Sequence, residues 1–259
     1  MITLYDISST LPNTPFSANT WKARLTLNYK GLAYKTEWVE YTDFASVYQK
    51  HNLPAPAKRP DGSPRYTLPV IYDDATGTAV ADSLEIAKYL DERYPESPRA
   101  LPPAGEDGVD SVKQVEEFGN LLLRQLVPFL PLLFKKSMDI QVGASREYAS
   151  AARARVLTQF GHKIKTIDEL EISEVEEAEI WQKMKGLFDQ FDEKFGGKGV
   201  VGWYRGDGVS FVDFIMGGLL LAIRITWGEE SEQWKALSQW NEGKWAKYLD
   251  NLRSYQTVH

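Results

Sequence analysis

The sequence of 259 residues contains no cysteine. A chain without cysteine has no disulfide framework, no thiolate metal site and no thiol nucleophile, so thiol–disulfide exchange through a residue of its own is excluded. Any thiol chemistry must therefore use a thiol that a ligand brings. Histidine is also scarce, because His51, His162 and His259 are the only three and lie far apart in the sequence. We do not expect them to form a metal site.

Long apolar runs and an excess of positive charge are missing too. No stretch approaches the length of a membrane-spanning helix, and the start of the chain resembles a strand rather than a secretory leader. We therefore expect a cytoplasmic protein that does not enter membranes. The net charge of −6 and the pI near 5.3 provide no basic face for phosphate groups, which argues against nucleic acid and anionic membranes as partners.

The first 95 residues alternate between strand-like and helix-like patterns. Strands are predicted at 2–7, at 34–41 and on either side of a turn at 73–77, and helices at 16–30, 43–49 and 83–94. Asp43 is expected to cap the second of these helices, and a loop rich in proline covers residues 52–65. The resulting order β-α-β-α-β-β-α is the one that a thioredoxin-like domain requires.

The remainder of the chain is helical in pattern. Residues 95–108 carry four prolines and two glycines and read as a linker. Helices are predicted from 109 to about 130, with a kink at Pro128 and Pro131, and at 145–167, 173–195 and 211–225. We therefore predict an α+β chain of two domains, a thioredoxin-like domain at 1–95 and an all-helical domain at 109–259.

The most informative feature of the sequence is a strand headed by proline and followed by an acidic residue and a serine. Leu68 and Pro69 precede an apolar strand, and Asp82 and Ser83 open the next helix. Proline is tolerated where a strand begins, and a helix start with side-chain oxygens and free N–H groups attracts a carboxylate. Taken singly, each motif has a simpler explanation. Pro69 is then an ordinary proline at the edge of a strand, and Asp82 forms a capping box with Glu85.

Together, the two motifs resemble the glutathione-binding half of glutathione transferases. In that family the backbone of the residue before a cis-proline pairs with the cysteinyl part of glutathione, and the acidic residue and serine hold its γ-glutamyl end. The resemblance implies the first role for Leu68 and Pro69 and the second for Asp82 and Ser83. Glutathione would then be the co-substrate that supplies the missing thiol. A homodimer is expected by analogy with the family.

A second resemblance to the same family lies at Ser210 and Asp213. A Ser/Thr-x-x-Asp box opens the central buried helix of the family's helical domain, after a turn rich in glycine and aromatic residues such as the one that begins here at Gly202. Its expected role is structural, because it satisfies N–H groups at a helix start. Loss of either residue should lower the free energy of unfolding by about 1 kcal/mol or more.

The catalytic group is expected between the first strand and the first helix. Only a few per cent of a free thiol is ionised at pH 7, so an O–H donor near the positive end of a helix would raise the reactive fraction. Ser17 is favoured, because residues 16–21 resemble the helix opening of serine-type fungal transferases related to bacterial β-etherases. Those relatives have a proline where this chain has Ala18. Ser17 as a plain N-cap is the alternative, with Asn19 as the substitute donor.

The segment from Tyr41 to Arg65 is longer than in common transferases, so the residue that holds the glycine carboxylate of glutathione cannot be transferred by position. Lys50, Lys58 and Arg65 are the candidates, because a carboxylate favours a lysine or arginine partner. Each of them is otherwise an ordinary solvated loop charge.

The second substrate is expected in a cleft between the domains, lined by apolar and aromatic side chains. Candidates are Phe118, Leu122 and Phe129, with Phe134 and Trp203, although aromatic residues at helical spacing are more often core. The predicted activity is attack of glutathione on hydrophobic aromatic electrophiles, including the ether cleavage that the etherase resemblance implies. The alternative is a ligandin that binds aromatic compounds with little turnover.

Overall fold

The computed structural model describes residues 1–59, 61–102, 110–141, 143–197, 201–204 and 208–259. Residues 103–108 of the predicted linker, the predicted start of the helical domain at Val109, and Pro60 and Gly199 lie outside the described residues. Within the described ranges, no helix combines the length and the apolar character needed to cross a membrane. The division at residues 95 and 109 stays a prediction.

A four-stranded sheet with the order β2-β1-β5-β6 forms the N-terminal region. Its strands are β1 (Ile2–Ile7), β2 (Tyr34–Val39), β5 (Val70–Asp73) and β6 (Thr78–Ala81). β1 pairs in parallel with β2 and antiparallel with β5. The parallel pair requires a crossover, which helix α1 (Ala18–Tyr29) supplies.

Helices cover both faces of this sheet. Side chains alternate along a strand, so Leu4 and Ile71 pack beneath α1 and α3 (Ser83–Arg93), whereas Tyr5 and Val70 pack beneath α2 (Phe44–Lys50). The order of elements confirms the predicted thioredoxin-like domain. Asp43 stands before α2, but its side chain makes no capping hydrogen bond; a 3-10 turn at Tyr41–Asp43 leads into the helix instead.

The segment predicted as a loop at 52–65 contains a short hairpin. Its strands are β3 (Ala57–Lys58) and β4 (Pro64–Arg65), which pair antiparallel. The Arg59 guanidinium closes the hairpin by donating to the Ser63 hydroxyl at 3.2 Å. The hairpin was predicted as a loop because prolines lack the backbone N–H that strand pairing uses. Each strand is also only two residues long, too short to show an alternating pattern.

The C-terminal region is helical, as predicted, with two corrections at helix ends. The helices are α4 (Ser111–Leu126), α5 (Leu130–Ser137), α6 (Gly143–Thr158), α7 (Glu174–Lys194), α8 (Phe211–Trp227) and α9 (Glu232–Asn251). The first predicted helix is interrupted by a 3-10 turn at Val127–Phe129, which accommodates Pro128. The second ends at Thr158, because Gly161 adopts φ +95° and its N–H bonds the Thr158 carbonyl at 3.2 Å.

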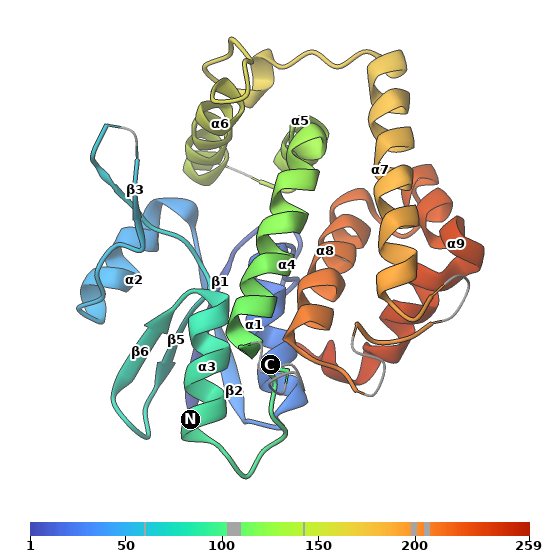
Figure 1. The fold of residues 1–259 in the computed structure, drawn as a ribbon. Helices are drawn as coiled ribbons and strands as arrows, with labels where there is room; N and C mark the ends of the chain where they lie inside the picture. The colour runs from blue at the N-terminus through green and yellow to red at the C-terminus, as the bar shows by residue number, and fades with distance from the viewer. Residues whose placement is uncertain (60, 103–109, 142, 198–200, 205–207) are drawn as a thin grey trace.

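Helix α8 is the centre of the molecule and packs directly on α1. Figure 1 shows the sheet and α2 on one side and α7 and α9 on the other, with α1, α4 and α8 between them. Close approach depends on Gly218, where an added Cβ would lie 2.7 Å from the carbonyl oxygen of Ala18. The start of α1 is therefore held against the helical region.

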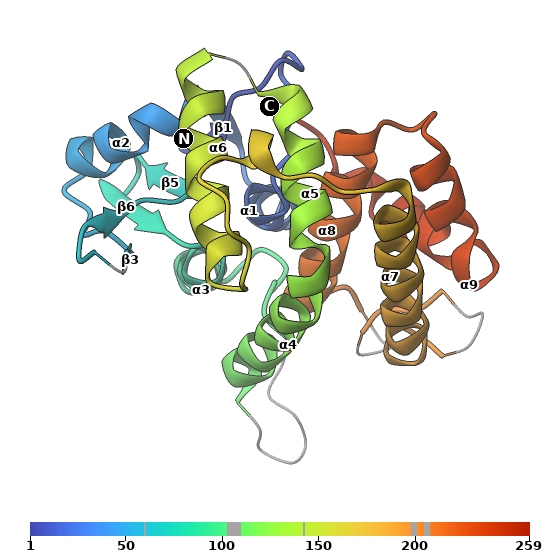
Figure 2. The ribbon, with the colours of Figure 1, turned by 90° about the horizontal axis from the view of Figure 1, so that it is seen from above.

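Helix α6 packs on α5, where Leu130 and Phe134 contact the apolar cluster that contains Leu157, and it also lies beside the N-terminal region near α2 (Figures 1 and 2). The Ser145 hydroxyl donates to the Glu40 carboxylate and accepts from the Tyr41 N–H, both at 3.1 Å. Arg59 in the hairpin donates to the Tyr148 hydroxyl at 2.7 Å. These contacts join two parts of the chain that are about a hundred residues apart in the sequence. Both parts lie beside one end of the sheet.

Candidate functional site

Two helix N-termini meet at one end of the sheet. β1 leads into α1 through residues 8–17, and β6 leads directly into α3. Val70 at the start of β5 pairs with Ala81 at the end of β6, so the segment before β5 lies at the same end. The unpaired N–H groups of helix N-termini carry partial positive charge. This end of the sheet is therefore suited to an anionic ligand.

Leu68 presents its backbone at this end. The Leu68–Pro69 peptide bond is cis, as the resemblance implied. The N–H and carbonyl of Leu68 form no hydrogen bond with any residue that the structure describes. The preceding residue, Thr67, is held by the hydroxyl of Tyr48, which donates to its carbonyl at 2.8 Å. An extended ligand strand would find both backbone groups of Leu68 available.

Asp82 and Ser83 form the start of α3. The Asp82 carboxylate accepts the N–H of Leu84 at 2.8 Å and so caps the helix. The capping box with Glu85, the simpler alternative, does not form, and Glu85 pairs with Lys88 at 2.7 Å. Asp82 has φ +78°, a backbone conformation that residues other than glycine rarely adopt. Such backbone strain is concentrated at functional sites. The Ser83 hydroxyl bonds to none of the described residues.

Ser17 stands at the N-cap of α1, yet its hydroxyl makes no capping hydrogen bond. Its carbonyl accepts the Trp21 N–H at 3.0 Å, and the Trp21 indole donates to the Pro15 carbonyl at 3.0 Å, which fixes the turn. Phe16 is buried in the same apolar cluster as Leu68. Ser17 is thus the neighbour of a residue that shares a cluster with Leu68, and its hydroxyl bonds to none of the described residues. Asn19 is exposed on the first turn of α1.

The three basic candidates differ in how far they are already engaged. Lys50 donates to the Tyr5 hydroxyl at 3.0 Å and lies 3.7 Å from Glu37; the bond to Tyr5 raises the pKa of Lys50. Lys58 and Arg65 are exposed on the β3–β4 hairpin and form no ion pair with the described residues. Arg65 remains a prediction for the glycine carboxylate, and Lys50 has partners elsewhere.

The predicted lining of the second substrate site is buried. Phe118, Leu122 and Phe129 are at most 5% exposed and belong to the core of the helical region. Phe118 packs on the rings of Phe191 and Phe195, with centroids 5.9 and 5.8 Å apart. The structure therefore shows these three as core residues, and their contact with a second substrate remains a prediction.

Sequence reasoning missed the helical residues that reach the candidate site. Ile140, before α6, and Ile225, in the last turns of α8, pack against the cluster that contains Phe16. The Ile140 carbonyl accepts the N–H of Thr10 in the loop before α1, at 3.0 Å. Next to it, the amide of Gln141 is buried, and neither its oxygen nor its nitrogen has a partner among the described residues. No local sequence pattern predicts these contacts, because they join segments that are far apart in the sequence.

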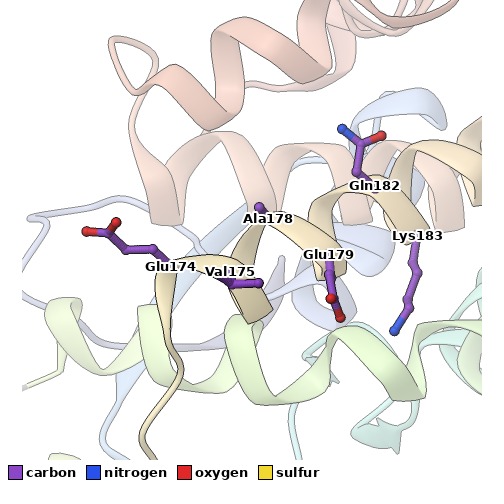
Figure 3. Close-up of a pocket in the computed structure, with 6 residues that line it drawn as sticks. All are labelled: Glu174, Val175, Ala178, Glu179, Gln182 and Lys183. Atoms are coloured by element: carbon purple, nitrogen blue, oxygen red, sulfur yellow. The ribbon is translucent and has the colours of Figure 1, made fainter.

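A separate groove of about 570 Å³ runs along the outer face of α7 (Figure 3). All six residues that line it come from α7 itself, and Val175 and Ala178 give it an apolar floor. Binding sites usually combine an apolar lining with polar groups that converge from several elements. A groove lined by one helix lacks that convergence, so we do not assign the site to it.

Comparison with known families identifies both regions of the chain. Residues 11–98 match the family model described as the N-terminal domain of glutathione S-transferase. Residues 116–255 match the model described as the C-terminal domain of glutathione S-transferase. The first match includes Ser17, Leu68, Pro69, Asp82 and Ser83.

Individual relatives extend over nearly the whole chain. The "Glutathione S-transferase-like protein ustS" of Aspergillus flavus is 30% identical and aligns with 93% of this chain and 91% of its own. A glutathione S-transferase of Ceriporiopsis subvermispora, solved in complex with glutathione, is 33% identical, with a TM-score of 0.86 over 100% of this chain and 98% of its own. The transferase GSTFuA3 of Phanerochaete chrysosporium is 34% identical, with the same TM-score and coverage.

Proposed function

Because the chain belongs to the glutathione S-transferase family, we propose that it binds glutathione between α1, the Leu68 turn and α3, and activates the glutathione thiol for attack on hydrophobic aromatic electrophiles. One observation carries the proposal. Ser17, Leu68 and Ser83 lie at one end of the sheet, and each has a hydrogen-bonding group without a partner among the described residues.

In this proposal glutathione lies across that end of the sheet as an extended strand. The N–H and carbonyl of Leu68 pair with its cysteinyl residue, as adjacent strands pair. Asp82 and Ser83 hold the γ-glutamyl end, where the start of α3 favours a carboxylate. Arg65, on the exposed hairpin, reaches the glycine carboxylate, for which an arginine offers two parallel donors. The cysteinyl sulfur then faces the start of α1.

The Ser17 hydroxyl activates the thiol by donating a hydrogen bond to the sulfur. A hydrogen bond to the charged form of a group favours that form, so it lowers the pKa of the bound thiol from the free value of about 8.5. The partial positive charge at the start of α1 acts in the same direction. Because the chain has no cysteine, the thiolate of glutathione is the nucleophile and no mixed disulfide with the enzyme forms.

The chemical step forms a bond between the glutathione sulfur and an electrophilic carbon of the second substrate. In a substitution, the electron pair of the bond that breaks leaves with the displaced group, and the thiol proton is released to solvent. In an addition to an α,β-unsaturated ketone, no group leaves: the π electrons shift onto the carbonyl oxygen and the resulting enolate takes up a proton. Where the displaced group is an aryloxide, the carbon–oxygen bond breaks and the aryloxide takes up a proton to give a phenol. This variant is the glutathione-dependent ether cleavage that the sequence resemblance implied.

A steady-state assay tests the proposed function. The purified chain is incubated with glutathione and a panel that contains an aryl halide, an α,β-unsaturated ketone and an aryl ether with a β-carbonyl group. We expect turnover of at least one aromatic electrophile that is abolished when S-methylglutathione replaces glutathione. Melting shifts with the same aromatic compounds and no turnover of any of them would identify a ligandin instead.

A further inference from the structure

The β3–β4 hairpin projects from the N-terminal region (Figure 1) and carries Arg65. Its strand residues are exposed, but Arg59, which follows the first strand, is half-buried. The Arg59 guanidinium donates to the hydroxyl of Tyr148 in α6 at 2.7 Å. Residues 57–59 and 61–65 are the part of the hairpin that the structure describes, and this is their only hydrogen bond or ion pair to another element. It therefore ties the hairpin to the helical region.

Arg59 also bonds the strand on which Arg65 stands. Its guanidinium donates to the Pro64 carbonyl and to the Ser63 hydroxyl. Pro64 directly precedes Arg65 on β4, and Arg65 itself pairs with Ala57 on β3. One side chain thus bonds both α6 and the strand that carries Arg65, so a change at the α6 contact is transmitted to Arg65.

Tyr148 has a defined position because its neighbour Tyr41 is fixed. The two rings are stacked, with centroids 6.5 Å apart and planes at 28°. Arg153 of α6 donates to the Tyr41 hydroxyl at 3.0 Å, and the Ser145 hydroxyl accepts the Tyr41 N–H at 3.1 Å. The Tyr148 hydroxyl is therefore presented to the hairpin from a ring that packs on an anchored partner.

We propose that Tyr148 is a positioning residue for glutathione, because through Arg59 it holds the hairpin where Arg65 reaches the glycine carboxylate. The inference rests on the proposed function, in which Arg65 binds that carboxylate. Ordering a flexible side chain or loop weakens binding, and a segment that is held before the ligand arrives loses less freedom. Part of the affinity for the glycine end would thus come from a helical residue that does not touch the ligand.

The test measures by isothermal titration calorimetry how much more tightly each variant binds glutathione than its glycinamide, in which a neutral amide replaces the glycine carboxylate. Wild type should prefer glutathione about tenfold or more, because a hydrogen bond between two charged groups is lost with the amide. Arg65→Met should lose this preference. Tyr148→Phe keeps the ring and removes the hydroxyl, and it should reduce the preference about threefold, as expected for the loss of one ordinary hydrogen bond.

Tyr41→Phe is the matched control. It removes a tyrosine hydroxyl that also accepts from an arginine, Arg153, at the contact between α6 and the N-terminal region, but it breaks no bond to the hairpin. The ring that stacks on Tyr148 is retained. The preference for glutathione over the glycinamide should be that of wild type.

A double variant distinguishes positioning from a general effect on the fold. In Arg65→Met the hairpin no longer carries the group that Tyr148 positions, so adding Tyr148→Phe should leave the affinity for glutathione unchanged. A tyrosine that acts only through the stability of the fold would lower the affinity by the same factor in both backgrounds and for both ligands. That result would overturn the inference.

The outcomes separate this inference from the function on which it rests. If wild type does not bind glutathione, the transferase proposal itself fails. If wild type binds glutathione but has no preference over the glycinamide, or Arg65→Met keeps the preference, the inference is overturned and glutathione binding stands. If Arg65→Met loses the preference but Tyr148→Phe keeps it, the positioning role alone is overturned. Should Tyr148→Phe not fold, Arg59→Met breaks the same bond from the hairpin side, and an unchanged preference in that variant would overturn the inference.

Discussion

The N–H of Asp82 donates a hydrogen bond to the carbonyl of Pro69 over 3.3 Å. The two residues are separated by the β5–β6 hairpin in the sequence, but in the sheet they lie side by side, since Val70 pairs with Ala81. The bond places the free backbone of Leu68 close to the start of α3. Two motifs that are weak on their own therefore form one surface, and this is the surface to which we assign glutathione.

Asp82→Asn should weaken glutathione binding at least about tenfold with little change in stability. Asparagine caps helices as well as aspartate does and tolerates a positive φ, so the helix start at φ +78° is preserved while the charge that we propose faces the γ-glutamyl ammonium is lost. Calorimetric titration with glutathione and urea unfolding measure the two effects. The control is Asp110→Asn, because the Asp110 carboxylate caps α4 with the same hydrogen-bond pattern, accepting the N–H two residues on, Val112, at 2.9 Å, but at an ordinary φ of −60°. Equal affinity in wild type and Asp82→Asn would reduce Asp82 to a helix cap.

Tyr94→Phe should lower the free energy of unfolding at pH 7 by about 1.5 kcal/mol. Burial by itself would raise the pKa of Asp73, but hydrogen bonds from Tyr94 at 2.6 Å, from Tyr89 at 2.7 Å and from a backbone N–H outweigh it and lower that pKa. A carboxyl with a lowered pKa in the fold stabilises it above the unfolded value of about 3.9, and this contribution is lost as the pH falls through the folded pKa.

The difference between Tyr94→Phe and wild type should therefore shrink as the pH falls below about 4. Urea unfolding of both proteins across the acid range measures it. A difference that is constant with pH would mean that Tyr94 acts through packing alone and not through the Asp73 carboxylate.

Ser210→Ala should destabilise the chain more than Ser173→Ala, although both serines belong to capping boxes. Asp213 is buried, which raises its pKa, and accepts bonds from the Ser210 hydroxyl at 2.9 Å and N–H at 2.8 Å. The Ser173 box is exposed to solvent. We expect a loss of about 2 kcal/mol at Ser210 and about 0.5 kcal/mol at Ser173, measured by urea unfolding. Equal losses would show that burial adds nothing to the cap.

Gln141→Leu should raise the free energy of unfolding by about 1 kcal/mol, because a buried amide with no partner among the described residues costs roughly that much or more. Leucine has a similar size and no polar atoms. Chemical unfolding in the absence of glutathione measures the change. The matched control is Gln256→Leu, since the Gln256 nitrogen donates to the Leu249 carbonyl at 2.8 Å and its oxygen accepts from Arg224 at 3.0 Å, and both bonds would be lost. A loss of stability in Gln141→Leu would show that the amide has a partner in solution.

Local patterns were enough to predict most of the thioredoxin-like region. Hydrophobic periodicity gave β1 and α1, and Pro69 and Asp82 marked the starts of β5 and α3. The helix predicted at 145–167 was too long because the glycine at 161 was not read as a helix end, although its positive φ makes it one.

The missing parts of the site depend on contacts between distant segments. The Ile140 carbonyl bonds the loop before α1 because the segment that leads into α6 lies against the N-terminal region. Nothing in the sequence near Ile140 predicts this contact.

The most direct test of the account is an absorbance titration of the thiolate of bound glutathione in wild type, Ser17→Ala and Asn19→Ala. The account predicts an apparent pKa below the free value of about 8.5 in wild type, a rise toward that value in Ser17→Ala, and no change in Asn19→Ala. Turnover of Ser17→Ala should be low at neutral pH and recover in part as the pH rises and the thiol ionises unaided. An unchanged titration in Ser17→Ala would contradict the account, and a shift in Asn19→Ala alone would assign the activation to the amide.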